Sequence, residues 1–200
     1  MNTVSYVTQQ AVRADPFGPV QPKEAAEHMH VALLQPSNAP RYRSLMLEAY
    51  ELAADAFTST AEERAAEPES FWVKRIADST GLSAAFGAFE GQELIGTVTL
   101  EFAAKPKTKH KALVIGMYVT PAARGTGTGR ALLMAAIEHA QSMESLLLLT
   151  LSVTEGNASA VNLYLSVGFQ EYGIEPMAIL TPSGLKGKVL MSLLLQDRDA

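Results

Sequence analysis

The chain has 200 residues, 48% hydrophobic and 18% charged, a composition that predicts one globular domain with a sizeable core. The formal net charge of -5 favours a small or positively charged substrate and gives no general attraction for nucleic-acid phosphates. The sequence has no cysteine, which excludes disulfides, thiolate metal ligands and a cysteine nucleophile. The longest apolar stretch, residues 146–153, is too short to cross a bilayer. We therefore expect a cytoplasmic protein with no membrane or nucleic-acid partner.

The first part of the chain divides into an extension and the start of a folded domain. Residues 1–27 are interrupted by proline and glycine and have little hydrophobic periodicity, so we predict an N-terminal extension there and one domain over 28–200. A short strand is predicted over 30–35, and a helix over 40–54.

A second helical segment follows. Thr60 and Glu63 have the spacing of a capping box, which marks a helix start, and Pro68 interrupts or restarts that helix. Trp72 and Ile76 are expected to face the core.

Three strands are predicted next. Residues 84–89 and 94–102 are joined by Glu90-Gly91-Gln92-Glu93, a connection that suits a hairpin with a bulged or four-residue turn. The third strand covers 112–119 and stops before Pro121, since proline cannot continue a sheet ladder.

A glycine-rich segment, Arg124-Gly125-Thr126-Gly127-Thr128-Gly129, separates that strand from an amphipathic helix predicted over 128–142. The first N–H groups of a helix lack internal partners and carry a partial positive charge of about half a unit, so they attract anions. Glycines allow a phosphate to approach closely, and Arg124 can add a charge-assisted bond. The alternative is a tight turn without a ligand. Neither the nucleoside triphosphatase loop nor the dinucleotide-binding fingerprint fits the spacing.

The last strongly patterned region holds a strand and a helix. Residues 146–153 are apolar enough to predict a central strand covered on both faces. Asn157 then predicts a helix N-cap and Gly168 the left-handed residue that ends the helix. Asn157 and Tyr164 are expected to lie on one face of that helix.

Three segments resemble the GNAT superfamily of N-acetyltransferases. Arg124-x-x-Gly127-x-Gly129 is similar to its acetyl-CoA pyrophosphate signature, Gln/Arg-x-x-Gly-x-Gly/Ala. The segment Asn157-x-x-Ala160-x-x-Leu163-Tyr164-x-x-x-Gly168-Phe169 is similar to its second motif, and Gly116-Met117-Tyr118-Val119-x-Pro121 also resembles the family. The resemblance implies an α/β (α+β) fold whose mixed central sheet is flanked by helices. The sheet would be splayed between the strand ending at Val119 and the strand ending at Val153.

The resemblance also implies a cosubstrate, acetyl-CoA, and a set of binding residues, with no metal. Backbone groups of Met117 and Val119 would pair with the pantetheine arm, and Asn157 would contact the same region. Tyr164 would direct its hydroxyl at the thioester sulfur as proton donor. The pyrophosphate would be held by the turn residues Arg124, Gly125, Thr126, Gly127, Thr128, Gly129 and Arg130.

The general base is left open. Many relatives have a glutamate where this chain has Leu113. Ionisable groups on neighbouring segments are Glu101, His110, Glu155, Glu171 and Glu175. A water chain or an amine of low pKa is the alternative.

The C-terminal part predicts two strands, 178–181 and 189–195, joined by a turn-rich loop over 182–187. Tyr172, Ile174 and Glu175 are candidates to line an acceptor pocket, and packing at the sheet edge is the alternative.

The leading functional hypothesis is an N-acetyltransferase that moves an acetyl group from acetyl-CoA to a primary amine of a small molecule, peptide or protein, with a homodimer as a further expectation. One alternative is a non-catalytic acyl-CoA-binding sensor or regulatory domain. Another is an acyltransferase for a longer acyl group or an oxygen acceptor.

Overall fold

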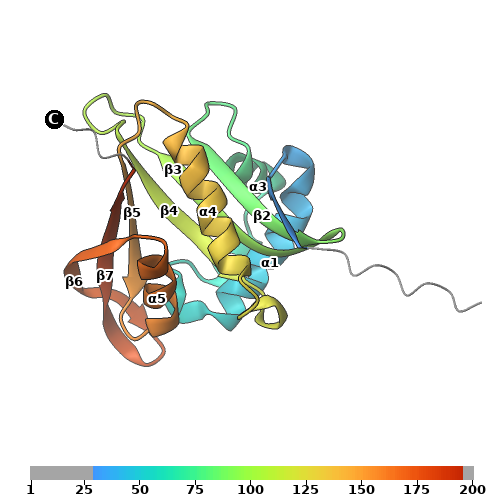
Figure 1. Ribbon diagram of the computed structural model, residues 1–200. Helices are drawn as coiled ribbons and strands as arrows, with labels where there is room; N and C mark the ends of the chain where they lie inside the picture. Colours follow the sequence, from blue (N-terminus) through green and yellow to red (C-terminus); the bar gives the residue numbers. More distant parts are fainter. Residues whose placement is uncertain (1–28, 196–200) are drawn as a thin grey trace, which may run out of the picture.

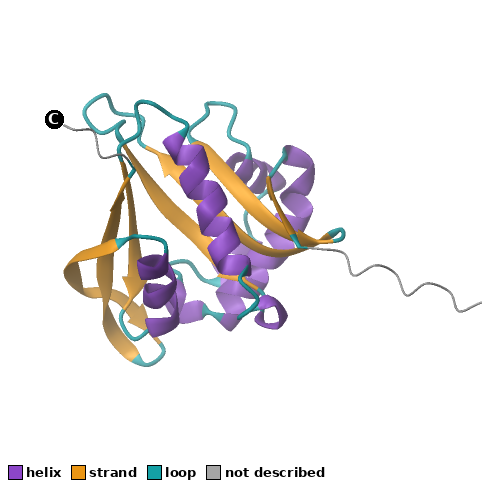
Figure 2. Ribbon diagram, in the orientation of Figure 1, coloured by secondary structure: helices purple, strands orange, loops and turns teal. Residues whose placement is uncertain are grey.

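Seven strands pair into one mixed sheet in the order β1-β2-β3-β4-β5-β7-β6. The structure is a computed structural model that describes residues 29–195, so the predicted extension over 1–27 lies outside the described residues. All neighbouring strands are antiparallel except β4 and β5, which are parallel and joined by the crossover helix α4. Helices lie on both faces of the sheet (Figure 2). The mixed, helix-flanked fold predicted from the sequence is confirmed.

The strands are β1 (His30–Leu33), β2 (Ser83–Glu90), β3 (Glu93–Phe102), β4 (Lys111–Val119), β5 (Leu148–Thr154), β6 (Gln170–Thr181) and β7 (Gly184–Leu194). The α-helices are α1 (Ala39–Leu52), α2 (Ala61–Ala65), α3 (Glu69–Ile76), α4 (Thr128–Gln141) and α5 (Ala158–Ser166). Short 3-10 turns cover Pro36–Asn38, Ala54–Ala56 and Pro121–Ala123.

The predicted capping box starts α2. The Thr60 hydroxyl accepts a hydrogen bond from the Glu63 N–H at 3.1 Å, and the Thr60 N–H donates to the Glu63 carboxylate at 2.8 Å. Pro68 then separates α2 from α3. Trp72 and Ile76 of α3 are buried, as predicted.

The β2–β3 hairpin is also confirmed. Glu90 pairs with Glu93, so Gly91 and Gln92 form a two-residue turn, and Gly91 has a φ of 57°. The register shifts between Ala88 and Phe89, which introduces a bulge close to the turn.

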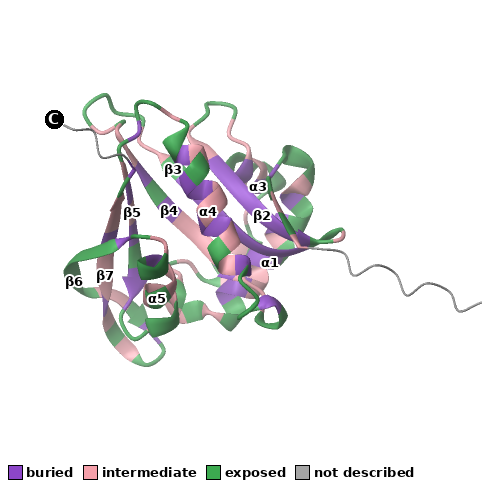
Figure 3. Ribbon diagram, viewed as in Figure 1, coloured by how far each residue is buried: buried purple, intermediate pink, exposed green. Residues whose placement is uncertain are grey.

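Two apolar clusters cover the two faces of the sheet. On one face α4 packs over β2, β3 and β4, and its Leu132, Leu133 and Ala136 are buried among strand residues. On the other face α1 and α3 pack over β2 and β3, where Tyr42 and Trp72 are fully buried. Figure 3 shows the buried residues concentrated where these helices meet the strands. The sheet is therefore the middle layer of three.

Strand β5 departs from its prediction. It is central, between β4 and β7, but its two faces are covered unequally. Leu149, Leu151 and Val153 belong to the cluster under α4, whereas Ser152 on the other face is exposed. On that second face Thr154 is buried and Leu148 and Thr150 are half-buried, so the predicted cover on both faces is wrong only at Ser152, which borders a cavity.

The C-terminal hairpin is longer than predicted. Strands β6 and β7 run continuously to a tight turn at Pro182 and Ser183, so most of the predicted loop over 182–187 is strand. The pairing is irregular between Glu175 and Ile179, where β6 holds extra residues that include Pro176. This irregularity masked the strand pattern in the sequence, because proline cannot join the ladder.

We expect Leu149→Ala to lower the free energy of unfolding by about 2–5 kcal/mol, since the Leu149 side chain is fully buried in the cluster under α4. Leu52→Ala is the matched control, because Leu52 at the end of α1 is 62% exposed, and it should change stability by less than about 0.5 kcal/mol. Urea unfolding of both variants checks the pair. Equal losses would contradict this description of the core.

Candidate functional site

The central feature of the site is the point where β4 and β5 stop pairing. Their parallel pairing covers only Lys111–Leu113 of β4 and Leu148–Thr150 of β5. Beyond it, β4 continues to Val119 and β5 to Thr154 without a hydrogen-bonded partner strand between them. Figure 1 shows the two strands diverging toward α5 and the start of α4. The splay predicted between these strands is therefore present.

A bulge in β4 lies within the splay. Thr99 of β3 is opposite Ile115, but Thr97 is opposite Tyr118, so β4 has one residue more than β3 in this interval. Gly116, inside the bulge, has a φ of 60°, a conformation that favours glycine. The bulge lies beyond the last β4–β5 pair at Leu113, where the backbone groups on the β5 side of β4 have no strand partner.

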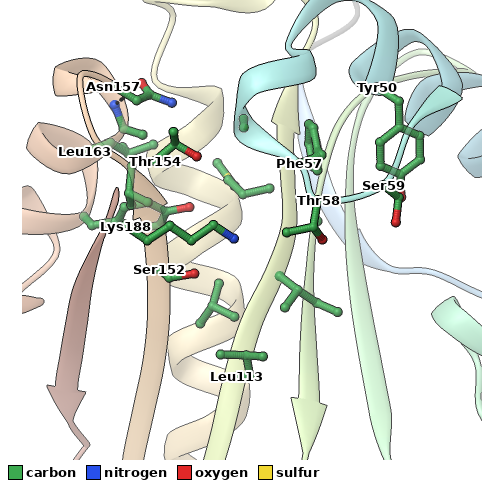
Figure 4. A pocket seen from close by; sticks show the side chains of 18 of the residues that line it. Tyr50, Phe57, Thr58, Ser59, Leu113, Ser152, Thr154, Asn157, Leu163 and Lys188 are labelled. Carbon is green, nitrogen blue, oxygen red and sulfur yellow. Dashed lines mark hydrogen bonds between the residues drawn. The ribbon is translucent and has the colours of Figure 1, made fainter. Parts of the chain in front are cut away.

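A cavity of about 320 Å³ occupies the splay. Its walls come from β4 residues 113–117, β5 residues 152–154, α5 and the segment that follows α1. Figure 4 shows Phe57 and Thr58 on one side of this space and Ser152 and Thr154 on the other. The Lys188 side chain extends into the space from the β7 side.

The glycine turn lies at the N-terminus of α4. Gly125 and Gly127 have φ values of 78° and 90°, and Gly127 is the N-cap of the helix. A Cβ atom added at either glycine would meet no atom within 4 Å, so the turn presents its backbone to open space. The first N–H groups of α4 lack partners inside the helix. This arrangement suits an anion.

The two arginines of the turn contact the protein itself. Arg124 donates from Nε to the Val119 carbonyl at 3.0 Å, and its guanidinium lies 5.6 Å from the centre of the Tyr118 ring. Arg130 donates to the Ser166 carbonyl at 2.8 Å and so links α4 to α5. Arg124 therefore braces the end of β4, with its charge next to the glycine turn.

Gly129 allows three elements to meet at the start of α4. A Cβ atom there would lie 3.1 Å from the Leu163 side chain on α5 and 3.3 Å from that of Met117 on β4. Met117 also lines the cavity. The glycine turn is thereby held close to the splay.

Asn157 and Tyr164 of the α5 motif both line the cavity. Asn157 caps α5, since its side-chain oxygen accepts a hydrogen bond from the Ala160 N–H at 3.2 Å. The Tyr164 ring packs against Phe169 at 5.8 Å, and its hydroxyl makes no hydrogen bond to the described residues. Burial raises the pKa of Tyr164 to about 12, so the hydroxyl stays protonated at neutral pH and can act as a donor.

Comparison with known proteins gives the family. The acetyltransferase (GNAT) family matches residues 46–169, which is more than half of the chain. The chain belongs to the GNAT family. The sequence resemblance to this family is thereby confirmed.

Solved structures of GNAT proteins share the fold at low sequence identity. A GNAT acetyltransferase from Streptococcus pneumoniae is 23% identical, with a TM-score of 0.71 over 84% of this chain and 100% of its own. The yncA protein of Salmonella typhimurium, solved with acetyl-CoA, is 18% identical, with a TM-score of 0.72 over 86% and 97% of the two chains. The ribosomal-protein-S18-alanine N-acetyltransferase of Escherichia coli is 19% identical, with a TM-score of 0.64 over 86% and 99%. No curated protein matches the sequence.

Part of this GNAT cavity was not foreseen from the sequence. Arg64 of α2, Arg75 of α3 and Lys188 of β7 line it, together with Tyr50 and the hydroxyl residues Thr58 and Ser59. None of these residues belongs to a motif, and only packing of distant segments brings them together.

The acidic residues considered as general base do not line the cavity. Glu101 is paired with Leu113 across β3 and β4 but borders a neighbouring hollow. Glu155 accepts a hydrogen bond from the Gly187 N–H at 2.8 Å, and Glu171 and Glu175 are exposed on β6.

The remaining candidates for the site also lie elsewhere. His110 is not a wall residue of the cavity. Tyr172 and Ile174 are 59% and 58% exposed on the edge strand, so they pack at the sheet edge and do not line the pocket. Over residues 29–195, no helix is long and apolar enough to span a membrane, and no cluster of His, Asp or Glu could hold a metal ion.

The raised pKa of Tyr164 predicts a pH-dependent stability. The folded protein holds the Tyr164 proton more tightly than the unfolded chain does. The stability that this difference contributes is complete below pH 10 and is lost as the pH rises toward 12. Between pH 9 and 11 we expect the wild type to lose about 1 kcal/mol more stability than Tyr164→Phe. Tyr50 and Tyr118, whose pKa values burial also raises, are present in both proteins and cancel in the difference. Urea unfolding of both proteins across this pH range measures the difference in stability. Identical pH profiles would contradict the raised pKa of Tyr164.

Proposed function

We propose that the protein transfers an acetyl group from acetyl-CoA to a primary amine by direct attack of the amine on the thioester. The proposal rests on one observation. The open N-terminus of α4, at Gly127, lies next to a cavity, and the walls of this cavity include an unpaired strand edge and the Tyr164 side chain. The first feature suits a pyrophosphate, and the second suits a narrow thioester arm. Membership of the GNAT family supports both assignments.

The residues present fit acetyl-CoA. The N–H groups from Gly125 to Arg130 would hold the pyrophosphate, since no side chain fills the space above Gly125 and Gly127. The pantetheine arm would follow the unpaired edge of β4 at Met117 and Val119 in the manner of an added strand. Asn157 contributes from the opposite wall.

In the reaction, the amine nitrogen forms a bond to the thioester carbon, and the carbon–sulfur bond breaks to release the thiolate of CoA. Backbone N–H groups at the bulge near Gly116 are the available donors for charge on the carbonyl oxygen. Tyr164 is the available donor for the departing sulfur.

The pKa of Tyr164 decides how it assists. Complete proton transfer from a hydroxyl of pKa about 12 to a thiolate whose conjugate acid has a pKa of about 8.5 is uphill by roughly 5 kcal/mol. Tyr164 therefore acts chiefly as a hydrogen-bond donor that stabilises the thiolate, which gains its proton from water.

Loss of the amine proton needs no carboxylate in the cavity. The walls carry Arg64, Arg75 and Lys188 and no Asp or Glu. Like charges disfavour a protonated amine, so the cavity favours the neutral, nucleophilic form and the proton leaves to water. This accounts for Leu113 at the position where many relatives have a glutamate.

The acceptor class is proposed only as a primary amine of a small molecule, peptide or protein. The Escherichia coli relative is described as an S18-alanine N-acetyltransferase, which makes a peptide N-terminus one member of this class. The cytoplasmic location and the homodimer stay predictions. Exposed apolar side chains on the edge strand β6, such as Met177 and Leu180, form the surface to probe for the homodimer.

A sensor domain that binds acyl-CoA without catalysis is the second candidate. The absence of a carboxylate among the cavity walls favours it. Thiol release from acetyl-CoA across a panel of amines separates the two functions, because a sensor binds the molecule and releases no thiol.

We expect Tyr164→Phe to lower kcat by about 10²-fold, the loss expected when one positioned hydrogen-bond donor to developing charge is removed, with the dissociation constant of acetyl-CoA changed less than about twofold. The phenyl ring keeps the contact with Phe169 while the donor is lost. A thiol-release assay and calorimetry measure the two quantities. An unchanged kcat would remove Tyr164 from the mechanism.

Gly127→Ala should weaken acetyl-CoA binding by about tenfold or more, since alanine strains the turn that aligns N–H donors with a charged group. Gly156→Ala is the matched control, because Gly156 has a φ of 91° and equally open surroundings but lies outside the turn. Both should lose about 1–2 kcal/mol of stability. Calorimetry with acetyl-CoA compares the three proteins. No heat with the wild type would refute the proposed function.

A further inference from the structure

The cavity continues from the splay toward α1, α2 and α3, and the charged side chains on its walls are all positive. Three basic side chains, Arg64, Arg75 and Lys188, line the walls, and no acidic side chain does. The net charge of the whole chain is -5, so this local excess of positive charge runs against the average of the molecule. The charge of the walls is therefore a specific property of the cavity.

Arg75 is the most enclosed arginine of the cavity wall that lacks a salt bridge to the described residues. Its Nε atom is enclosed and has no hydrogen-bond partner, and its guanidinium forms no salt bridge in the part of the chain that the structure describes. Burial lowers the pKa of Arg75, but the nearby Tyr42, Tyr50 and Glu101 outweigh burial and raise it, so it stays charged. A charge held in a partly buried position without a close counter-ion is costly unless a ligand compensates it.

Arg64 is already fixed in position beside it. Arg64 donates to the Ser59 hydroxyl at 2.7 Å and pairs with Glu67 at 3.5 Å, while its enclosed Nε has no partner. The Phe71 ring lies 4.8 Å from the Arg64 guanidinium and 5.7 Å from that of Arg75. One ring thus holds both guanidinium groups and restricts their freedom before any ligand arrives.

This pair of arginines lies close to the reacting end of the cavity. The Tyr42 hydroxyl, which makes no hydrogen bond of standard geometry, interacts electrostatically with Arg75. The same hydroxyl is 3.6 Å from the position of a Cβ atom on Gly116, in the bulge of β4. A single side chain therefore separates Arg75 from the bulge.

Glu101 is the acidic group nearest to this arrangement. It borders a second hollow, of about 760 Å³, which Arg75 also lines, and it does not line the cavity. Within the cavity, Arg75 therefore meets no acidic wall residue that would compete with a ligand.

From this arrangement we propose that the acceptor is a compact amine that also carries an oxyanion, a carboxylate or a phosphoryl group, which Arg75 and Arg64 bind. Guanidinium groups match both oxyanions through parallel N–H donors. Lys188, on the β7 side, adds to the attraction. The inference rests on the proposed acetyl transfer and names the class of acceptor for that same cavity.

Matched acceptors test the class. L-amino acids are compared with their amides, and O-phosphoethanolamine with ethanolamine, by thiol release from acetyl-CoA. We expect kcat/KM to favour the anionic member of at least one pair by about 10- to 100-fold, the range for hydrogen bonds to a charged group. The two sets of pairs distinguish a carboxylate from a phosphoryl group. An alanine-initiated peptide amide is included as the neutral peptide acceptor.

Variants of Arg75 test the residue. Arg75→Gln should lower kcat/KM for the preferred anionic acceptor by about 10- to 100-fold, mostly through KM, and change the neutral partner less than about twofold. Arg75→Lys keeps the positive charge but loses the pair of parallel N–H donors, so its kcat/KM should lie between those of the wild type and Arg75→Gln. Lys74→Gln is the control, because Lys74 is the neighbouring exposed cation on α3 and does not line the cavity. Thermal unfolding verifies that each variant is folded.

The outcomes separate this inference from the proposed function. Calorimetry on the same preparations reports acetyl-CoA binding, and its absence refutes the proposed function itself. If acetyl-CoA binds but the neutral amines or the peptide amide react as well as the anionic member of each pair, the proposed oxyanion-binding role of Arg75 and Arg64 is refuted. It is also overturned if acetyl-CoA binds and no anionic acceptor promotes thiol release, or if Arg75→Gln slows both members of a pair equally.

Discussion

The separation of β4 from β5 after Leu113 is the constraint on which the rest of the structure depends. Strands inside a sheet normally satisfy each other's backbone groups, and an unpaired interior edge is unfavourable unless something else can pair with it. Here β4 carries a bulge at Gly116 and stays paired with β3 while it separates from β5, and the space between β4 and β5 is the cavity. The same interruption explains why Ser152 on the second face of β5 is exposed. A local defect in pairing therefore creates the binding space and supplies its free backbone groups.

Helix α4 connects this space to the stability of the fold. Its apolar face, with Leu132 and Leu133, is buried in the larger cluster, so the helix cannot move without disturbing the core. Its N-terminus is fixed at the opening of the splay by the close approach at Gly129 and by the bond from Arg130 to α5. The N–H groups that would receive an anion are thus held in place before binding, which lowers the entropic cost of association.

The electrostatics of the cavity differ from those of the whole molecule. An acidic chain with a net charge of -5 encloses a space whose charged wall residues are all basic, with Leu113 at the position where the family resemblance implied a glutamate. A positive cavity favours an amine in its neutral form and attracts an oxyanion on the same molecule. The missing strand carboxylate and the basic walls are therefore consistent with one another.

The sequence by itself determined the features whose causes are local. Hydrogen bonds and dihedral requirements act over a few residues, which is why the capping box at Thr60, the cap at Asn157 and the glycine turn before α4 could all be predicted, and with them the family and the splayed sheet. Only the tertiary structure decided what lines the cavity. Arg64, Arg75 and Lys188 come from separate elements far apart in the chain, and no short-range rule relates them. The exposed Ser152 on β5 and the extended β6–β7 hairpin escaped prediction for the same reason, because burial and strand pairing depend on segments that meet only in the folded protein.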